Sequence, residues 1–367
     1  MTSRRLIACA VAIVAWSLLA SGEAGAARTA AAGSITEVPV GMRSHSYLFG
    51  LTTGPDRAVW FADLSCTGLG RCAIGRLDRR GRVSEYRRGL AAGSVPYTIA
   101  AGPDGNLWFT DEGRRPAIGR ITPRGHITEF RHGLARGSEP FRITTGPGGD
   151  LWFTDQGKRP AIGRITPGGH ITEFRRGLPK DSTPFGITAT PGGLWFTDHG
   201  CNGSGRCAVG RVSANGRISE LRHGLRAGSQ PLGIAAGRGG DAWFADSSGA
   251  IGHVTSGGRI TERTRGLAAG SSPVAIAAGP DGGMWFTDEG VNPAVGRVTP
   301  TGGLREFSRG LLPGSQPADI TLGPDGRMWF TDEGATTALG TVTTGAACSG
   351  SCRSVQDRAR AALAALG

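Results

Sequence analysis

Several signatures of common catalytic sites are missing from this sequence. Beyond the first 26 residues there is no Gly-x-Ser-x-Gly, no His-Glu-x-x-His and no phosphate-binding glycine loop, so the usual motifs of serine hydrolases, zinc proteases and nucleotide-binding proteins are absent. No Cys-x-x-Cys occurs, and no histidine lies at ligand spacing from the cysteines, which argues against a zinc site. Glycine is abundant instead, with 63 residues, as expected for a fold with many tight turns.

Lysine is almost absent. Only Lys158 and Lys180 occur among 41 basic residues, although the formal net charge is +12. The arginines are spread along the chain rather than clustered, so we expect no nucleic acid partner. A positive surface attracts anionic cell-wall polymers, but this attraction is screened by salt and gives no specificity.

Only one long apolar run occurs, at residues 6–20. Arg4 and Arg5 precede it, and small residues suited to signal peptidase cleavage follow at positions 24–26. The run is too short for a membrane-spanning helix. We therefore expect residues 1–26 to be a signal peptide, the protein to be secreted or otherwise extracytoplasmic, and no transmembrane segment to remain after cleavage.

The cysteines agree with export. Apart from Cys9, the six cysteines fall into three local pairs that we expect to be disulfides. The pairs are Cys66 with Cys72, Cys201 with Cys207, and Cys348 with Cys352.

The tetrapeptide Trp-Phe-(Thr or Ala)-Asp recurs seven times. Its tryptophans are Trp60, Trp108, Trp152, Trp195, Trp243, Trp285 and Trp329. The spacings of 48, 44, 43, 48, 42 and 44 residues are typical of a β-propeller, in which each unit is a four-stranded sheet. The sequence therefore predicts an all-β, seven-bladed propeller over residues 27–345, which we expect to be monomeric.

The chain ends are expected to close the ring. The last unit stops after its third strand, at residues 339–343, while an isolated fourth-strand sequence lies at residues 34–40. Pairing the two would complete blade seven and leave no long free edge. Residues 346–367 would form a tail with a local disulfide and a possible short helix.

The unit pattern Gly-Pro-Asp-Gly, Leu-Trp-Phe-Thr-Asp, Ile-Gly-Arg-Ile-Thr and Ile-Thr-Glu-Phe, with a Pro-x-x-Ile entry into each unit, resembles the virginiamycin B (streptogramin B) lyase family. The resemblance covers about residues 34–344. It implies a carbon–oxygen lyase that opens a cyclic depsipeptide antibiotic by elimination at its ester, and thereby antibiotic resistance. It also implies a magnesium ion and a histidine general base, which suit proton removal next to a carbonyl.

The resemblance assigns places to the catalytic groups. The two histidine places fall on Val274 and Ala318, and the two glutamate places fall on Gln316 and Glu333. Only Glu333 keeps the family's residue type, so the catalytic histidines are missing. The equivalent residues of the other units accept no proton near neutral pH. They are Phe49, Tyr97, Phe141, Phe185 and Leu232.

We expect a small-molecule or cell-wall ligand to bind at the mouth of the central funnel, where the innermost strands begin. Aromatic residues at four consecutive entries would form one wall, and Arg142 and Glu112 would add polar groups. The four are Phe49, Tyr97, Phe141 and Phe185. Alternatively, these rings pack between the blades and only stabilise the fold.

The position after each tetrapeptide varies between units. Its residues are Leu64, Glu112, Gln156, His199, Ser247, Glu289 and Glu333. Glu289 and Glu333, together with Asp319, could supply oxygen ligands for magnesium or calcium, although Asp319 could instead form a salt bridge with Arg142. His199 is the candidate general base, and Glu333 is the second catalytic candidate. The recurring aspartate itself, from Asp63 to Asp332, is expected to be a hydrogen-bonding device at the strand ends.

The sequence is compatible with three functions. The first is an exported, lyase-like propeller that binds a ligand at its funnel. The second is a lyase whose base has moved, with His199 acting beside Glu289 and Glu333. The third is a scaffold that binds cell-wall glycan or a protein, since a fold alone does not fix activity.

Overall fold

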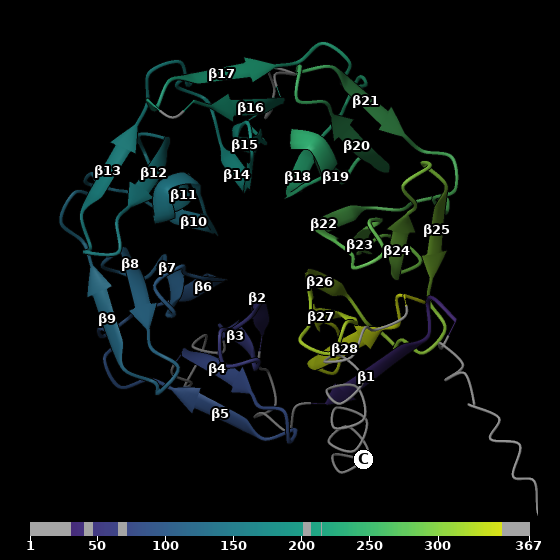
Figure 1. Cartoon of the computed structure of the whole chain (residues 1–367), viewed down its shortest axis with the longest axis horizontal. Coiled ribbons are helices and arrows are strands. Elements are labelled where there is room, and N and C mark those ends of the chain that lie inside the picture. Colours follow the sequence, from purple (N-terminus) through teal and green to yellow (C-terminus); the bar gives the residue numbers. More distant parts are fainter. Residues whose placement is uncertain (1–30, 40–46, 65–71, 201–206, 214, 347–367) are drawn as a thin grey trace, which may run out of the picture.

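The computed structural model describes residues 31–39, 47–64, 72–200, 207–213 and 215–346. In these residues the strands form seven four-stranded sheets, which surround a central axis as the blades of a propeller (Figure 1). Neighbouring strands of each blade pair antiparallel, from the innermost outward. The all-β, seven-bladed fold predicted from the repeat is confirmed.

The first six blades each use four consecutive strands. Blade one contains β2 (Leu48–Thr53), β3 (Val59–Asp63), β4 (Ala73–Leu77) and β5 (Val83–Tyr86); blade two contains β6 (Pro96–Ala101), β7 (Leu107–Asp111), β8 (Ala117–Ile121) and β9 (Ile127–Phe130); and blade three contains β10 (Pro140–Thr145), β11 (Leu151–Asp155), β12 (Ala161–Ile165) and β13 (Ile171–Phe174). Blade four contains β14 (Pro184–Thr190), β15 (Gly193–Asp198), β16 (Ala208–Val212) and β17 (Ile218–Leu221); blade five contains β18 (Pro231–Ala236), β19 (Ala242–Asp246), β20 (Ala250–Val254) and β21 (Ile260–Arg263); and blade six contains β22 (Pro273–Ala278), β23 (Met284–Asp288), β24 (Ala294–Val298) and β25 (Leu304–Phe307). Two short 3-10 turns, η1 (Pro147–Gly149) and η2 (Arg238–Gly240), precede the second strands of blades three and five.

Blade seven combines strands from both ends of the described chain. It contains β26 (Pro317–Leu322), β27 (Met328–Asp332), β28 (Ala338–Val342) and, as its outermost strand, β1 (Ile35–Pro39). β1 pairs antiparallel with β28, so that Ile35 lies opposite Val342. Figure 1 shows this purple strand against the yellow end of the chain. The predicted closure of the ring is confirmed.

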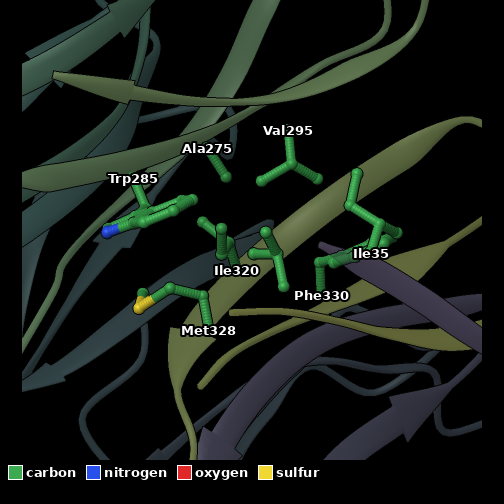
Figure 2. Packing of buried hydrophobic residues seen from close by; sticks show 8 residues of the cluster. Ile35, Ala275, Trp285, Val295, Ile320, Met328 and Phe330 are labelled. Carbon is green, nitrogen blue, oxygen red and sulfur yellow. The ribbon is translucent and has the colours of Figure 1, made fainter. Parts of the chain in front are cut away.

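The hydrophobic core lies between neighbouring blades. Trp285 of blade six packs against Ile320, Met328 and Phe330 of blade seven, and Ile35 of β1 joins the same cluster (Figure 2). Equivalent clusters occupy the other boundaries between blades. Because each blade buries its tryptophan strand against the next, no blade is stable alone and the ring is needed to complete the core.

A glycine in each third strand makes room for the phenylalanine of the tetrapeptide. In blade two, Gly119 of β8 pairs with Phe109 of β7. A Cβ atom on Gly119 would lie 2.0 Å from the Phe109 ring. This close approach explains why the unit pattern reads Ile-Gly-Arg at this point.

In blades two to seven, the recurring aspartate joins two loops at the end of the blade where the innermost strand begins. In blade two, Asp111 Oδ1 accepts the backbone N–H groups of Val95 at 2.7 Å and of Gly113 at 2.8 Å. In blade seven, Asp332 makes the same pair of contacts. The aspartate is therefore a structural device at the strand end, as predicted.

Several predictions from the sequence lie outside the described residues. They are the signal peptide at residues 1–26, the tail at residues 347–367 and the cysteines Cys66, Cys201, Cys348 and Cys352. Cys72 and Cys207 are described and buried, while the three disulfide pairings stay predictions. In the part of the chain that is described, no helix is long and apolar enough to cross a membrane.

Candidate functional site

The mouth of the propeller is built from two kinds of strand end. In blade two, Pro96 at the start of β6 pairs with Asp111 at the end of β7. In blade seven, Pro317 pairs with Asp332 in the same way. The loops that enter the innermost strands and those that leave the second strands therefore meet at one end of the ring, as the sequence predicted.

Each innermost strand carries an irregularity directly after its entry. In blade three the pairing register shifts between Pro140 and Ile143, a feature that re-aims the side chains between them. The backbone N–H of Arg142 donates to Thr154 Oγ1 at 3.0 Å, and this hydroxyl donates in turn to the carbonyl oxygen of Phe185 at 2.8 Å. The tetrapeptide threonine thus fixes the irregular strand of its own blade and ties it to the next blade.

The four predicted aromatic residues form a continuous arc at this level. Ring centres lie 4.5 Å apart for Phe49 and Tyr97, 4.6 Å apart for Tyr97 and Phe141, and 4.6 Å apart for Phe141 and Phe185. Phe49 and Phe141 are buried, whereas Tyr97 and Phe185 are partly exposed. The rings therefore pack against one another from blade to blade, and two of them also keep some accessible surface. Ligand binding by the arc stays a prediction.

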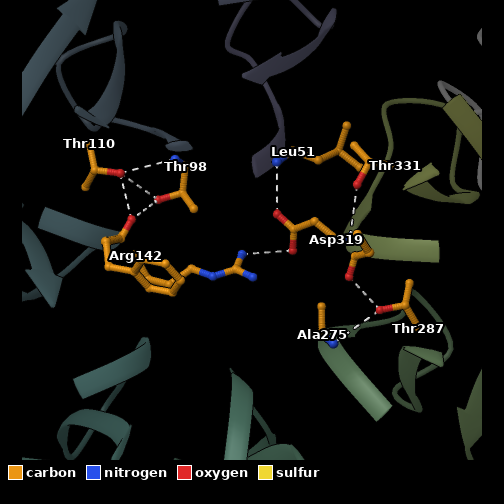
Figure 3. A network of polar contacts seen from close by, with 10 residues as sticks. Leu51, Thr98, Thr110, Arg142, Ala275, Thr287, Asp319 and Thr331 are labelled. Carbon is orange, nitrogen blue, oxygen red and sulfur yellow. Dashed lines mark hydrogen bonds and ion pairs between the residues drawn. The ribbon is translucent and has the colours of Figure 1, made fainter. Parts of the chain in front are cut away.

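An ion pair spans the mouth. Arg142 Nη1 of blade three lies 3.1 Å from Asp319 Oδ1 of blade seven (Figure 3). Asp319 Oδ2 also accepts the backbone N–H of Leu51 at 3.0 Å. The guanidinium carbon lies 4.7 Å from the centre of the Phe49 ring and 5.8 Å from that of Phe185, within the range of cation–π attraction. The salt bridge considered from the sequence is confirmed.

Carboxyl groups gather beside this pair. Burial raises the pKa of Glu333 to about 8, and the negative charges of Glu289 and Asp319 contribute, although a hydrogen bond from the Tyr47 hydroxyl and the charge of Arg142 favour the ionised form. Burial also raises the pKa of Glu289 to about 6. Glu333 is therefore mostly protonated at neutral pH and can donate a hydrogen bond.

Glu112 lies at the corresponding place in blade two. Burial raises its pKa to about 7, and the negative charges of Glu139 and Asp111 add to this effect. Its charge also acts on Tyr97, so Glu112 belongs to the same mouth as the aromatic arc.

The proposed metal ligands do not fit a magnesium or calcium ion. Asp319 uses both carboxylate oxygens, one toward Arg142 and one toward Leu51. Within the described residues, no three or more His, Cys, Asp and Glu side chains are arranged to hold a metal. The guanidinium of Arg142 already places a positive charge beside Asp319, where it would repel a cation.

His199 lies in another sector of the mouth. Its ring centre is 6.3 Å from that of Phe185. Burial lowers the pKa of His199, and the charge of Asp198 opposes this shift. For the residues that the structure covers, the imidazole does not join Glu289 and Glu333 in a metal-holding cluster.

Tyr47 also lies at the mouth, although no motif in the sequence points to it. This residue precedes β2, is 45% exposed, and donates a hydrogen bond to Glu333. The place before each strand entry varies between units, from Val95 to Glu139 to Gln316, and this variation was the available signal. The variation alone does not show that the residue of blade one reaches Glu333 of blade seven.

The two histidine places of the resemblance hold apolar side chains. Val274 is 8% exposed and Ala318 is fully buried, both within the irregular starts of their strands. Neither can accept or donate a proton through its side chain.

Comparisons with known proteins identify the family of this chain. The sequence model of the virginiamycin B lyase family matches residues 20–209 and 205–351. A selenomethionine-substituted virginiamycin B lyase from Staphylococcus aureus is 30% identical, with a TM-score of 0.72, over 84% of this chain and 99% of that chain. A catalytically inactive histidine-to-alanine variant of virginiamycin B lyase from the same organism, with quinupristin, is 31% identical at the same TM-score and coverage.

More distant structures share the fold alone. A gluconolactonase from Xanthomonas campestris is 15% identical, with a TM-score of 0.53, over 87% of this chain and 92% of that chain. A comparison with curated proteins finds no match. From the family match and its solved relatives, the chain belongs to the virginiamycin B lyase family.

Proposed function

We propose that this protein is an exported propeller that binds a small or polymeric ligand at its mouth without carrying out the family's elimination reaction. One observation carries the proposal: four aromatic rings form an arc at the mouth, and the Arg142 guanidinium lies beside Phe49 and Phe185 in that arc. An apolar wall with a few fixed polar groups is the usual form of a ligand site.

The apolar side chains at the two places that the resemblance assigns to histidine, Val274 and Ala318, support the non-catalytic part of the proposal. Proton removal next to a carbonyl requires a base near neutrality and a positive group for the developing oxyanion. Val274 and Ala318 supply no base, and Asp319 is engaged by Arg142. These side chains therefore supply no imidazole at the places that the resemblance assigns to the base.

A lyase with a relocated base is the second candidate, and Glu333 is the observation that favours it. A carboxyl group with a pKa of about 8 that contacts a tyrosine hydroxyl is of the type used in general acid–base catalysis. Arg142 would then supply the positive charge. This candidate differs from the first only in turnover.

Turnover separates the two candidates. The purified protein is incubated with a streptogramin B antibiotic and magnesium, with the Staphylococcus aureus lyase as a positive control, and the products are followed by chromatography with mass spectrometry. We expect no opened chain of unchanged mass. Opening that disappears in Glu333→Gln would replace the first candidate by the second.

Binding at the mouth is tested with two matched tyrosine variants. Tyr97 belongs to the arc, whereas Tyr86 stacks on Trp60 at the outer strand β5. Cell-wall fragments and a streptogramin B antibiotic are titrated while tryptophan fluorescence is recorded. We expect saturable binding that Tyr97→Leu weakens and Tyr86→Leu does not. Equal loss in both variants would contradict a ligand site at the mouth.

Export is supported by the basic and apolar pattern of residues 1–20 and the small residues at 24–26. N-terminal sequencing of the protein from the culture medium should begin at residue 27. An intact N-terminus on protein confined to the cytoplasm would contradict export.

A further inference from the structure

The guanidinium of Arg142 uses only part of its hydrogen-bonding capacity. Nη1 faces Asp319 Oδ1 at 3.1 Å. Nε and Nη2 are buried, and among the described residues neither has a hydrogen-bond partner. Buried N–H groups in folded proteins nearly always have a partner, either protein, water or ligand. An oxygen atom of water or of a ligand is therefore expected at this edge.

The geometry of this edge limits the guest. Nε and Nη2 lie on one side of the planar guanidinium, and their N–H bonds are parallel and spaced to match the two oxygens of a carboxylate. The rings of Phe49 and Phe185 lie beside the guanidinium and hold it in place. Asp319 fixes the other side of the group. A planar, bidentate acceptor fits this edge better than a single carbonyl oxygen does.

We propose that the Nε–Nη2 edge of Arg142 anchors a carboxylate group of the ligand, while the remainder of that ligand lies along Tyr97 and Phe185. This inference rests on the proposed ligand binding at the mouth and names the chemistry that the mouth selects. Arg142 would then supply the positive charge of the site, so ligand binding should need no added magnesium.

The other charged groups at the mouth set a pH dependence. Asp319 faces Arg142 directly, and Glu289, Glu333, Glu112 and the hydroxyls of Tyr47 and Tyr97 are other titratable groups of the mouth. When Glu289 and Glu333 are protonated they do not repel an anion, and Glu333 can donate a hydrogen bond. A carboxylate should therefore bind more tightly at pH 5.5 than at pH 8.5, across the pKa values of about 6 and about 8.

The test uses phenylacetate and its neutral isostere phenylacetamide as probes. Protein labelled with ¹⁵N-arginine is titrated with each probe, without magnesium, and the Nε–H signals are followed by NMR. The Arg142 signal is assigned through its contacts with the Phe49 and Phe185 rings. We expect phenylacetate to shift this signal in a saturable manner and phenylacetamide to leave it unchanged.

Two lysine variants provide a matched comparison. Arg164 of blade three also faces an aspartate, Asp150, and lies over two aromatic rings, Trp152 and Phe174. Arg142→Lys keeps the positive charge but removes the two parallel N–H groups of the guanidinium, so the affinity for phenylacetate should fall by about tenfold. Arg164→Lys should leave the affinity unchanged. The NMR titration of the wild-type protein does not depend on either variant, so it still tests the proposal if Arg142→Lys fails to fold.

The outcomes separate this inference from the proposed function. Equal binding of both probes, or an Arg142 signal that phenylacetate does not move, would show that water alone fills the edge and would overturn the carboxylate anchor. If neutral cell-wall fragments still bind in a Tyr97-dependent manner, the proposed function survives that loss. If no compound binds at the mouth, both fall.

Discussion

At the scale of single residues, Arg142 and Asp319 depend on each other. Their side chains are 13% and 11% exposed, and removing one charge leaves the other buried without its partner. Asp319→Ala should therefore lower the free energy of unfolding by about 3 kcal/mol. Urea denaturation measures this loss. The double variant Arg142→Met with Asp319→Ala should lose less than the sum of the single variants, and strict additivity would contradict the coupling.

Glu333 links stability to pH. Its pKa is raised from 4.5 to about 8 in the folded protein, so between these values the native state holds a proton that the unfolded state releases. The contribution of Glu333 to stability is complete below pH 4.5 and is lost as the pH rises to about 8.

Glu333→Gln removes this titration. Its stability relative to the wild type should increase from pH 5 to pH 8, as measured by thermal unfolding at both values. Glu112→Gln serves as a comparison, because the pKa of Glu112 is raised only to about 7. A wild-type-like pH profile for Glu333→Gln would contradict the raised pKa.

The sequence could predict the residues of the mouth but not all of their contacts. The aromatic arc followed from one recurring entry position, and the Arg142–Asp319 pair followed from two unlike charges at equivalent places. Tyr47 was missed because the sequence does not show that a side chain before β2 of blade one reaches Glu333 of blade seven. The metal ligands were chosen by residue type alone, and residue type does not reveal that both oxygens of Asp319 are already engaged.

At the scale of strands, the glycine in each third strand is a steric requirement. A Cβ on Gly119 would approach the fully buried Phe109 ring to 2.0 Å, and the ring cannot move without disturbing the boundary between blades. Gly119→Ala should therefore destabilise the protein by about 2 kcal/mol or more, as overpacked cores do. Gly168→Ala is the control, because its nearest neighbour, Thr166 Oγ1, would be 3.7 Å away. Similar effects of both changes on urea denaturation would contradict the steric explanation.

The strands themselves were predictable from alternation and turn signals, whereas the irregular starts of the innermost strands were not. The register shift between Pro140 and Ile143 depends on the Thr154 hydroxyl, which accepts the N–H of Arg142 and donates to the next blade. Such a shift arises from contacts between strands and between blades, so the residue pattern of a single strand does not predict it.

At the scale of the whole molecule, β1 closes the ring. Besides its pairing with β28, Glu37 Oε1 accepts a hydrogen bond from the Ser315 hydroxyl at 3.1 Å, and the Leu312 N–H donates to the same carboxyl group. A protein that begins at residue 41 lacks all of these contacts and exposes the edge of β28. Its melting temperature should fall by about 10 °C, and it should aggregate more readily.

A protein that begins at residue 31 is the control for this truncation, because it keeps β1. Its melting temperature should equal that of the full mature chain. If both truncated proteins melt at the same temperature, the strand does not contribute to the stability of the ring.

The same arrangement has a consequence for protein engineering. Because Ile35 lies directly opposite Val342, a few added residues could join the two ends of a protein trimmed to residues 31–346. New termini could then be opened between blades three and four, giving a circular permutant in which all seven sheets are encoded as uninterrupted segments. The new ends would lie in the loop that enters β14, so a sensor or enzyme domain could be fused there, next to the mouth.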